Sequence, residues 1–144
     1  MSRPILLIAG GSRGIGAATA KLAGARGYDV AVNYKSNSNA AAGVVEAVKK
    51  AGGKAIAIAC DVSDEADATR AVREVEHAFG PANVLLNGVA ALDRTGTLLD
   101  IDLAEWNRVL AINLTSAFIM SRAVLPGMIA ARGGSIIHIA SSYA

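Results

Sequence analysis

Short apolar runs alternate along the chain with longer segments in which apolar residues recur every three or four positions. An apolar run bounded by glycine or polar residues is typical of a buried strand, and the longer spacing is typical of an amphipathic helix. The runs predict strands at residues 5–9, 30–34, 55–60, 84–86 and 135–140. The longer segments predict helices at residues 15–26 and 40–51, a third helix capped by Ser63, and a long fourth helix that begins at Asp102 and extends toward Gly133.

This alternation of strands and helices indicates the fold class. Parallel strands are joined by right-handed crossovers, so the order predicts an α/β domain with a doubly wound parallel sheet. No linker or repeat divides the sequence, and we expect one domain over residues 1–144. The composition agrees, because 53% of the residues are hydrophobic but only 4% are aromatic, which favours a core of Ala, Val, Leu and Ile.

Charge and cysteine content narrow the classes of function. The chain has 14 basic and 12 acidic side chains and no long run of one sign, which argues against nucleic-acid binding. Charged residues or glycine interrupt the longer apolar stretches, so we expect a soluble chain without a membrane partner. The single cysteine, Cys60, cannot form an intramolecular disulfide and favours a cytoplasmic location. His77 and His138 lack partners at metal-ligand spacing, so no metal site is expected.

A glycine-rich turn separates the first predicted strand from the first predicted helix. Missing side chains allow backbone N–H groups and the positive end of the helix dipole to approach a phosphate. The turn lacks the Gly-Lys-Ser/Thr ending of nucleoside-triphosphate loops, and Ala9 and Gly10 provide neither an acidic phospho-acceptor nor a flavin-type loop. A dinucleotide is therefore the better ligand, and the alternative is a tight turn that binds nothing. The candidate binding residues are Gly10, Ser12, Arg13, Gly14, Ile15 and Gly16.

The spacing of Gly10, Gly14 and Gly16 matches Gly-x-x-x-Gly-x-Gly and resembles the turn of the short-chain dehydrogenase/reductase family. The pair Asp61-Val62 is similar to that family's Asp-Val pair after the third strand, where the carboxylate accepts a hydrogen bond from the adenine amino group. The resemblance therefore implies that Asp61 and Val62 belong to the cofactor site.

Two later segments extend the resemblance over the whole chain. Residues 106–115 are similar to the family's fourth-helix pattern, and residues 134–142 resemble its fifth strand. Within the family, the sequence resembles members of the 3-oxoacyl-ACP reductase and glucose dehydrogenase type. The resemblance implies a Rossmann-type doubly wound parallel sheet, here truncated after the fifth strand, and a nicotinamide dinucleotide as cofactor.

The residues that end the second strand bear on the choice of cofactor. An NAD-selective site places Asp or Glu there to hold the ribose 2′-hydroxyl, whereas this sequence has Asn33-Tyr34-Lys35-Ser36. Arg13 and Lys35 can pair with a 2′-phosphate, which predicts NADP(H) rather than NAD(H), with Tyr34 at the same site. The alternative is that both cations are solvated surface charges.

Candidate catalytic residues follow only from the resemblance. In the family, a helix asparagine and a serine after the fifth strand support a tyrosine that exchanges a proton with the substrate while hydride passes to or from the nicotinamide. Asn113 matches the asparagine, and Ser142 matches the serine better than Ser141 does. Without the family, these residues indicate a helix-interior amide and a polar strand exit. The loop Asn87-Gly88-Val89-Ala90 departs from the family's Asn-Asn-Ala-Gly, but Asn87 stays a cofactor-binding candidate.

Two functions are compatible with these residues. One is the amino-terminal, cofactor-binding part of an NADP(H)-dependent oxidoreductase that interconverts a carbonyl and an alcohol of a small molecule. The other is a truncated dinucleotide-binding half-domain without turnover. The sequence favours it for this polypeptide because the Tyr-x-x-x-Lys pair is missing, and Tyr143 follows the serine too closely to be the tyrosine of that pair. The residues do not identify the substrate. Because the family's fourth helix packs between subunits, a homo-oligomer through the long fourth helix is expected.

Overall fold

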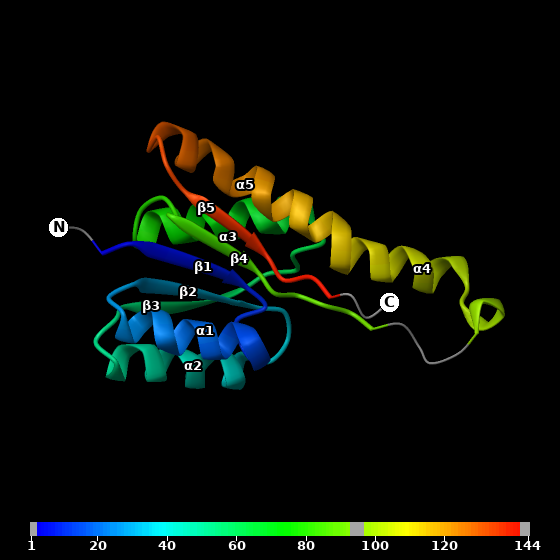
Figure 1. Cartoon of the computed structure of the whole chain (residues 1–144), viewed down its shortest axis with the longest axis horizontal. Coiled ribbons are helices and arrows are strands. Elements are labelled where there is room, and N and C mark those ends of the chain that lie inside the picture. The colour runs from blue at the N-terminus through cyan, green and yellow to red at the C-terminus, as the bar shows by residue number, and fades with distance from the viewer. Residues whose placement is uncertain (1–2, 93–96, 142–144) are drawn as a thin grey trace.

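Five parallel strands form a single sheet in the order β3-β2-β1-β4-β5 (Figure 1). The computed structural model describes residues 3–92 and 97–141. The strands are β1 (Ile5–Ala9), β2 (Asp29–Tyr34), β3 (Ala55–Ala59), β4 (Val84–Asn87) and β5 (Ser135–His138). The order reverses direction at β1, as in a doubly wound sheet, which confirms the predicted Rossmann-type fold.

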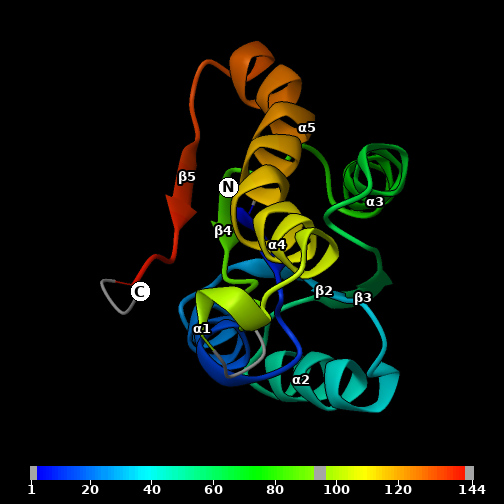
Figure 2. The same cartoon turned by 90° about the vertical axis from the view of Figure 1, so that its right-hand side faces the viewer.

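Helices cover both faces of the sheet, as Figure 2 shows. One face carries α1 (Gly14–Ala25) and α2 (Ser38–Lys50), and the other carries α3 (Glu65–Ala78) and α5 (Ser116–Ala130). A short 3-10 helix, η1 (Leu98–Asp100), precedes α4 (Leu103–Leu110). A π-helical segment, η2 (Ala111–Thr115), joins α4 to α5, so that one long helix extends beyond the carboxyl ends of the strands (Figure 1).

The core lies in two layers that meet at β1. Alternate side chains of a strand point to opposite faces of its sheet. Leu7 therefore packs with Leu85, Val75 and Met120 on the α3 and α5 side. Its neighbour Ile8 belongs to the other layer, under α1 and α2. A strand that is buried on both faces needs a continuous apolar sequence, which explains the unbroken run of β1.

The predicted cap of the third helix was wrong by one residue. The carboxylate of Asp64, not the hydroxyl of Ser63, accepts a hydrogen bond from the N–H of Asp67, at 2.8 Å. Ser63 instead donates its hydroxyl hydrogen to Asp61, at 2.6 Å. A carboxylate is the stronger partner for the positive end of a helix dipole, and the Ser63 hydroxyl is already engaged.

The long helix has a buried side and an exposed apolar side. Met120, Val124 and Met128 are buried against α3 and the sheet. Trp106 and Phe118 are exposed, at 52% and 63% of their surface. Among the described residues, this 28-residue helix is the segment whose length and composition would allow it to cross a membrane. Its α5 part packs on α3 and the sheet, whereas α4 has no buried residue, and the apolar side chains on the outer side of the helix are uncovered.

Candidate functional site

A crevice of about 490 Å³ lies at the carboxyl ends of β1, β2, β3 and β4. Ligands of open α/β sheets bind at such ends, next to the strand where the order reverses. Most of the predicted cofactor-binding residues line this crevice: Gly10, Ser12, Arg13, Gly14, Ile15, Gly16, Tyr34, Lys35, Asp61 and Val62. The structure therefore brings together predicted residues as far apart in the sequence as Gly10 and Val62.

The glycine turn allows close packing of backbone on backbone. Gly10 has a φ of +78°, in the left-handed region that favours glycine. A Cβ at Gly10 would lie 3.0 Å from the side chain of Val89, in the loop after β4. A Cβ at Gly16 would collide with the carbonyl oxygen of Gly10. Both glycines are thus required by the contacts of the turn with its neighbours.

Helix α1 begins in the crevice without a side-chain cap. Its N-cap residue is Arg13, which makes no capping hydrogen bond, and its first turn has no acidic residue. By contrast, Asn37, Asp64 and Asp102 each cap the helix that follows them. The first N–H groups of a helix have no partner within the helix, so the start of α1 offers donors to an anion.

Asn33 holds the exits of three strands together, a role that the sequence interpretation missed. Its side-chain oxygen accepts a hydrogen bond from the N–H of Gly10, at 3.1 Å, and its amide nitrogen donates to the carbonyl of Cys60, at 3.0 Å. Its own carbonyl accepts from the N–H of Gly11, at 2.8 Å. The signal was present, because a single amide interrupts the apolar run of β2 and is only 2% exposed.

Lys35 and Asp61 contact each other across the crevice. The Lys35 Nζ lies 2.6 Å from an oxygen of Asp61, and the Lys35 side chain is 65% exposed. The hydrogen bond from Lys35 is the main cause that lowers the pKa of the Asp61 carboxyl to about 2, and hydrogen bonds from Ser63 act in the same direction. Lys35, the predicted partner of a 2′-phosphate, and Asp61, the predicted partner of the adenine amino group, therefore pair with each other in this structure.

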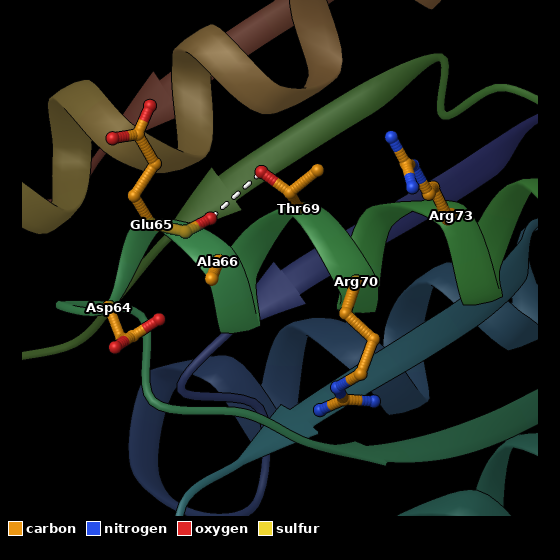
Figure 3. A pocket seen from close by; sticks show the side chains of 6 residues that line it. All are labelled: Asp64, Glu65, Ala66, Thr69, Arg70 and Arg73. Atoms are coloured by element: carbon orange, nitrogen blue, oxygen red, sulfur yellow. Dashed lines mark hydrogen bonds between the residues drawn. The ribbon is translucent and has the colours of Figure 1, made fainter.

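A second, larger hollow lies on the outer surface of α3, away from the crevice (Figure 3). Two of its charged side chains are engaged within the protein, since Arg70 pairs with Asp67 and Glu74, and Glu65 pairs with Arg122 of α5. Figure 3 shows Glu65 and Arg70 leaving α3 in opposite directions. This open surface lacks converging donors, so the crevice is the better candidate site despite its smaller volume.

The predicted catalytic residue Asn113 pins the loop after β4. Its side-chain oxygen accepts from the N–H of Ala91, at 2.7 Å, and its amide nitrogen donates to the Ala91 carbonyl, at 2.8 Å. Asn113 lies in η2, and π-helical turns within α-helices frequently occur at functional sites. The neighbouring Ile112 lines the crevice, whereas Ser142 lies outside the described residues and Ser141 is exposed beyond β5.

Asn87 faces β5 rather than the crevice. It is buried, and its amide nitrogen lies 3.0 Å from the Nδ1 of His138, its register partner on β5. The three residues that follow, Gly88, Val89 and Ala90, line the crevice in its place. The altered loop thus forms part of the crevice wall.

Thiol and imidazole groups are dispersed over the described part of the chain. Burial is the main cause that raises the pKa of the Cys60 thiol to about 12, which leaves it a poor nucleophile and a poor metal ligand. His77 lies on α3, and His138 contacts Asn87 on the sheet. In residues 3–92 and 97–141, no three His, Cys, Asp or Glu side chains gather as a metal site would require.

Comparison with known proteins identifies the family. The family model described as short chain dehydrogenase matches residues 4–144. The chain therefore belongs to the short-chain dehydrogenase family, a family of oxidoreductases that use NAD(H) or NADP(H).

Individual relatives agree with this membership. The chain is 37% identical over 140 residues to the uncharacterized oxidoreductase YgfF of Escherichia coli, covering 95% of this chain and 57% of that protein. It is 36% identical over 141 residues to a 3-oxoacyl-[acyl-carrier-protein] reductase of Synechocystis, covering 98% and 57%. The solved NADH-dependent reductase A1-R', responsible for alginate metabolism, matches with a TM-score of 0.91 at 26% identity, over 98% of this chain and 59% of that one. The chain thus spans less than two thirds of the length of these relatives.

Proposed function

We propose that this chain is the NADP(H)-binding part of an oxidoreductase that interconverts a carbonyl and an alcohol of a small molecule. The observation that carries the proposal is the uncapped start of α1, which faces the crevice beside the glycine turn. A pyrophosphate accepts hydrogen bonds from such N–H groups and is stabilised by the positive end of the helix dipole. The nicotinamide would supply the hydride, and this chain's residues would bind and orient the cofactor.

The charges of the crevice support NADP(H) over NAD(H). Strand β2 ends in Tyr34 and is followed by Lys35, so the end of β2 itself contributes no carboxylate to hold a ribose 2′-hydroxyl. Arg13 also lines the crevice and makes no ion pair with any residue that the structure describes. A guanidinium can make charge-assisted hydrogen bonds with a phosphate that NAD(H) does not carry.

Replacing Arg13 by alanine tests the preference. We expect the affinity for NADPH to fall about ten- to 150-fold, because a lost charge-assisted hydrogen bond costs roughly 1.5–3 kcal/mol. The affinity for NADH should change little. The measurement is calorimetric titration of the folded chain with both cofactors. Arg26→Ala, at the opposite end of α1, removes the same charge outside the crevice and should leave both affinities unchanged. Equal NADH and NADPH affinities in the wild-type chain would contradict the proposal.

We assign part of the chemical step to residues of this sequence. Asn113 would hold the loop beside the nicotinamide. A serine after β5 would position the substrate oxygen, and Ser142 is preferred over Ser141 for this role. A proton donor within hydrogen-bond reach is also needed, and the sequence contains no Tyr-x-x-x-Lys pair to provide it. That observation favours a second candidate function for these 144 residues by themselves, namely cofactor binding without turnover.

The proposal extends to a cytoplasmic location and to self-association through the long helix. The buried, lone Cys60 is compatible with a reducing compartment.

The exposed apolar side chains of the long helix form a stripe that the same stripe of a second copy would cover. They are Leu103, Trp106, Leu110, Leu114, Phe118, Leu125 and Ile129.

A charge placed in this stripe should prevent association. We expect the wild-type chain to sediment as a dimer at micromolar concentration and Phe118→Glu to sediment as a monomer, because the interface would bury an unpaired carboxylate. Leu22→Glu is the matched control, since Leu22 is 53% exposed on α1, outside the stripe. A monomeric wild-type chain, or a Phe118→Glu chain that still dimerises, would contradict the assignment.

A further inference from the structure

The ion pair of Lys35 and Asp61 lies where the proposed 2′-phosphate would bind. We propose that Asp61 limits the selectivity for NADP(H) by competing with the 2′-phosphate for Lys35, an inference that rests on the proposed function. Lys35 would then change its ion-pair partner: it would pair with Asp61 when NAD(H) or no cofactor is bound, and with the 2′-phosphate when NADP(H) binds.

The two side chains come from neighbouring strands that are held in register. Tyr34, which precedes Lys35, pairs with Ala59 of β3, and the N–H of Cys60 donates to the Tyr34 carbonyl, at 2.9 Å. This ladder sets Lys35 beside Asp61, with the Lys35 Nζ 2.6 Å from the carboxylate. A phosphate that contacts Lys35 therefore either approaches the Asp61 carboxylate or separates the pair.

Asp61 itself is fixed from two sides and is unable to follow Lys35. Its second oxygen accepts hydrogen bonds from the N–H and the hydroxyl of Ser63, at 3.0 and 2.6 Å. Its own N–H donates to the carboxylate of Asp67, at 2.7 Å, and Asp67 is held by Arg70. By contrast, the long side chain of Lys35 is mostly exposed, so the lysine is the mobile partner.

The fixed carboxylate acts only on ligands that carry a 2′-phosphate. With a pKa of about 2, Asp61 is ionised at neutral pH and repels a phosphate brought next to it. A cofactor with a free 2′-hydroxyl leaves the ion pair intact and meets no such repulsion. Because Arg13 has no ion-pair partner among the described residues, its attraction for the phosphate does not depend on Asp61.

Titrations with 2′,5′-ADP and 5′-AMP isolate this effect, because the two probes differ only in the 2′-phosphate and do not involve the nicotinamide half of the site. The measured quantity is the ratio of their affinities, in which any change in adenine binding cancels. We expect Asp61→Asn to raise the ratio in favour of 2′,5′-ADP by about three- to tenfold. In a Lys35→Met background, Asp61→Asn should raise the ratio by less than about twofold, because only the direct repulsion between Asp61 and the phosphate remains.

A charge-matched control separates local competition from the change in net charge. Glu46→Gln on α2 removes one negative charge from a residue that pairs with Lys49 and does not line the crevice. It should leave the ratio within about twofold of wild type. An unchanged ratio in Asp61→Asn, or an equal rise in the Lys35→Met background, would overturn the inference while leaving the proposed function intact. If the folded wild-type chain binds neither nucleotide, the proposed function fails and this inference fails with it.

Discussion

Gly16→Ala is expected to abolish NADPH binding and to lower the free energy of unfolding by about 2 kcal/mol, the range of an overpacked site. The added Cβ would collide with the carbonyl oxygen of Gly10 and would lie 3.0 Å from the Cα of Gly11. These are backbone atoms, so no change of rotamer relieves the contact. Either α1 moves away from β1 or the turn opens, and both displace the N–H groups at the start of α1.

Calorimetric titration with NADPH and urea unfolding measure the two effects. Gly43→Ala is the matched control, because Gly43 lies in α2, is exposed, and a Cβ added there would have no neighbouring atom within 4 Å. In a helix this substitution stabilises the protein by about 0.5–1 kcal/mol. The control should therefore unfold at a higher urea concentration than wild type and bind NADPH with the wild-type affinity. A Gly16→Ala chain with wild-type affinity would show that the turn does not hold the pyrophosphate.

Asn33→Ala is expected to cost about 3 kcal/mol of unfolding free energy, because each buried partner left unsatisfied costs roughly 1–3 kcal/mol. The N–H of Gly10 and the carbonyl of Cys60 would lose their side-chain partners in the buried part of the sheet. The NADPH affinity should also fall by at least about tenfold, because the glycine turn would lose its anchor to β2.

Chemical denaturation and NADPH titration measure these effects, and Asn107→Ala provides the control. Asn107 is an exposed amide on α4, where loss of the side chain should change neither quantity appreciably. If Asn33→Ala unfolds like wild type, the hydrogen bonds of Asn33 do not stabilise the meeting point of the three strand exits.

The fold could be predicted because each strand and helix has a local signal. The apolar run of β1 and the 3.6-residue period of α3 each depend on burial of one element against the sheet. The cap of α3 could not be assigned from the sequence, because Ser63 and Asp64 are both good N-cap residues and only the hydrogen bond from Ser63 to Asp61 distinguishes them.

The polar contacts of the site depend on tertiary structure and could not be predicted from local patterns. The pairing of Lys35 with Asp61 requires the register of β2 on β3, which no short segment contains. The reciprocal bonds of Asn113 with Ala91 join residues that are 22 positions apart. The glycine turn, by contrast, is a contiguous motif that is visible in the sequence alone, and its residues line the crevice.

The described lining of the crevice comes from the carboxyl ends of the first four strands and from η2. Every described residue that lines it lies between Gly10 and Ile112. Asn113, which holds the loop after β4, also lies in η2, so under the proposed function changes downstream of η2 would leave the residues that line the cofactor crevice in place. If the crevice holds the nicotinamide cofactor as proposed, changes of substrate that arise outside these elements would leave the choice of cofactor unchanged.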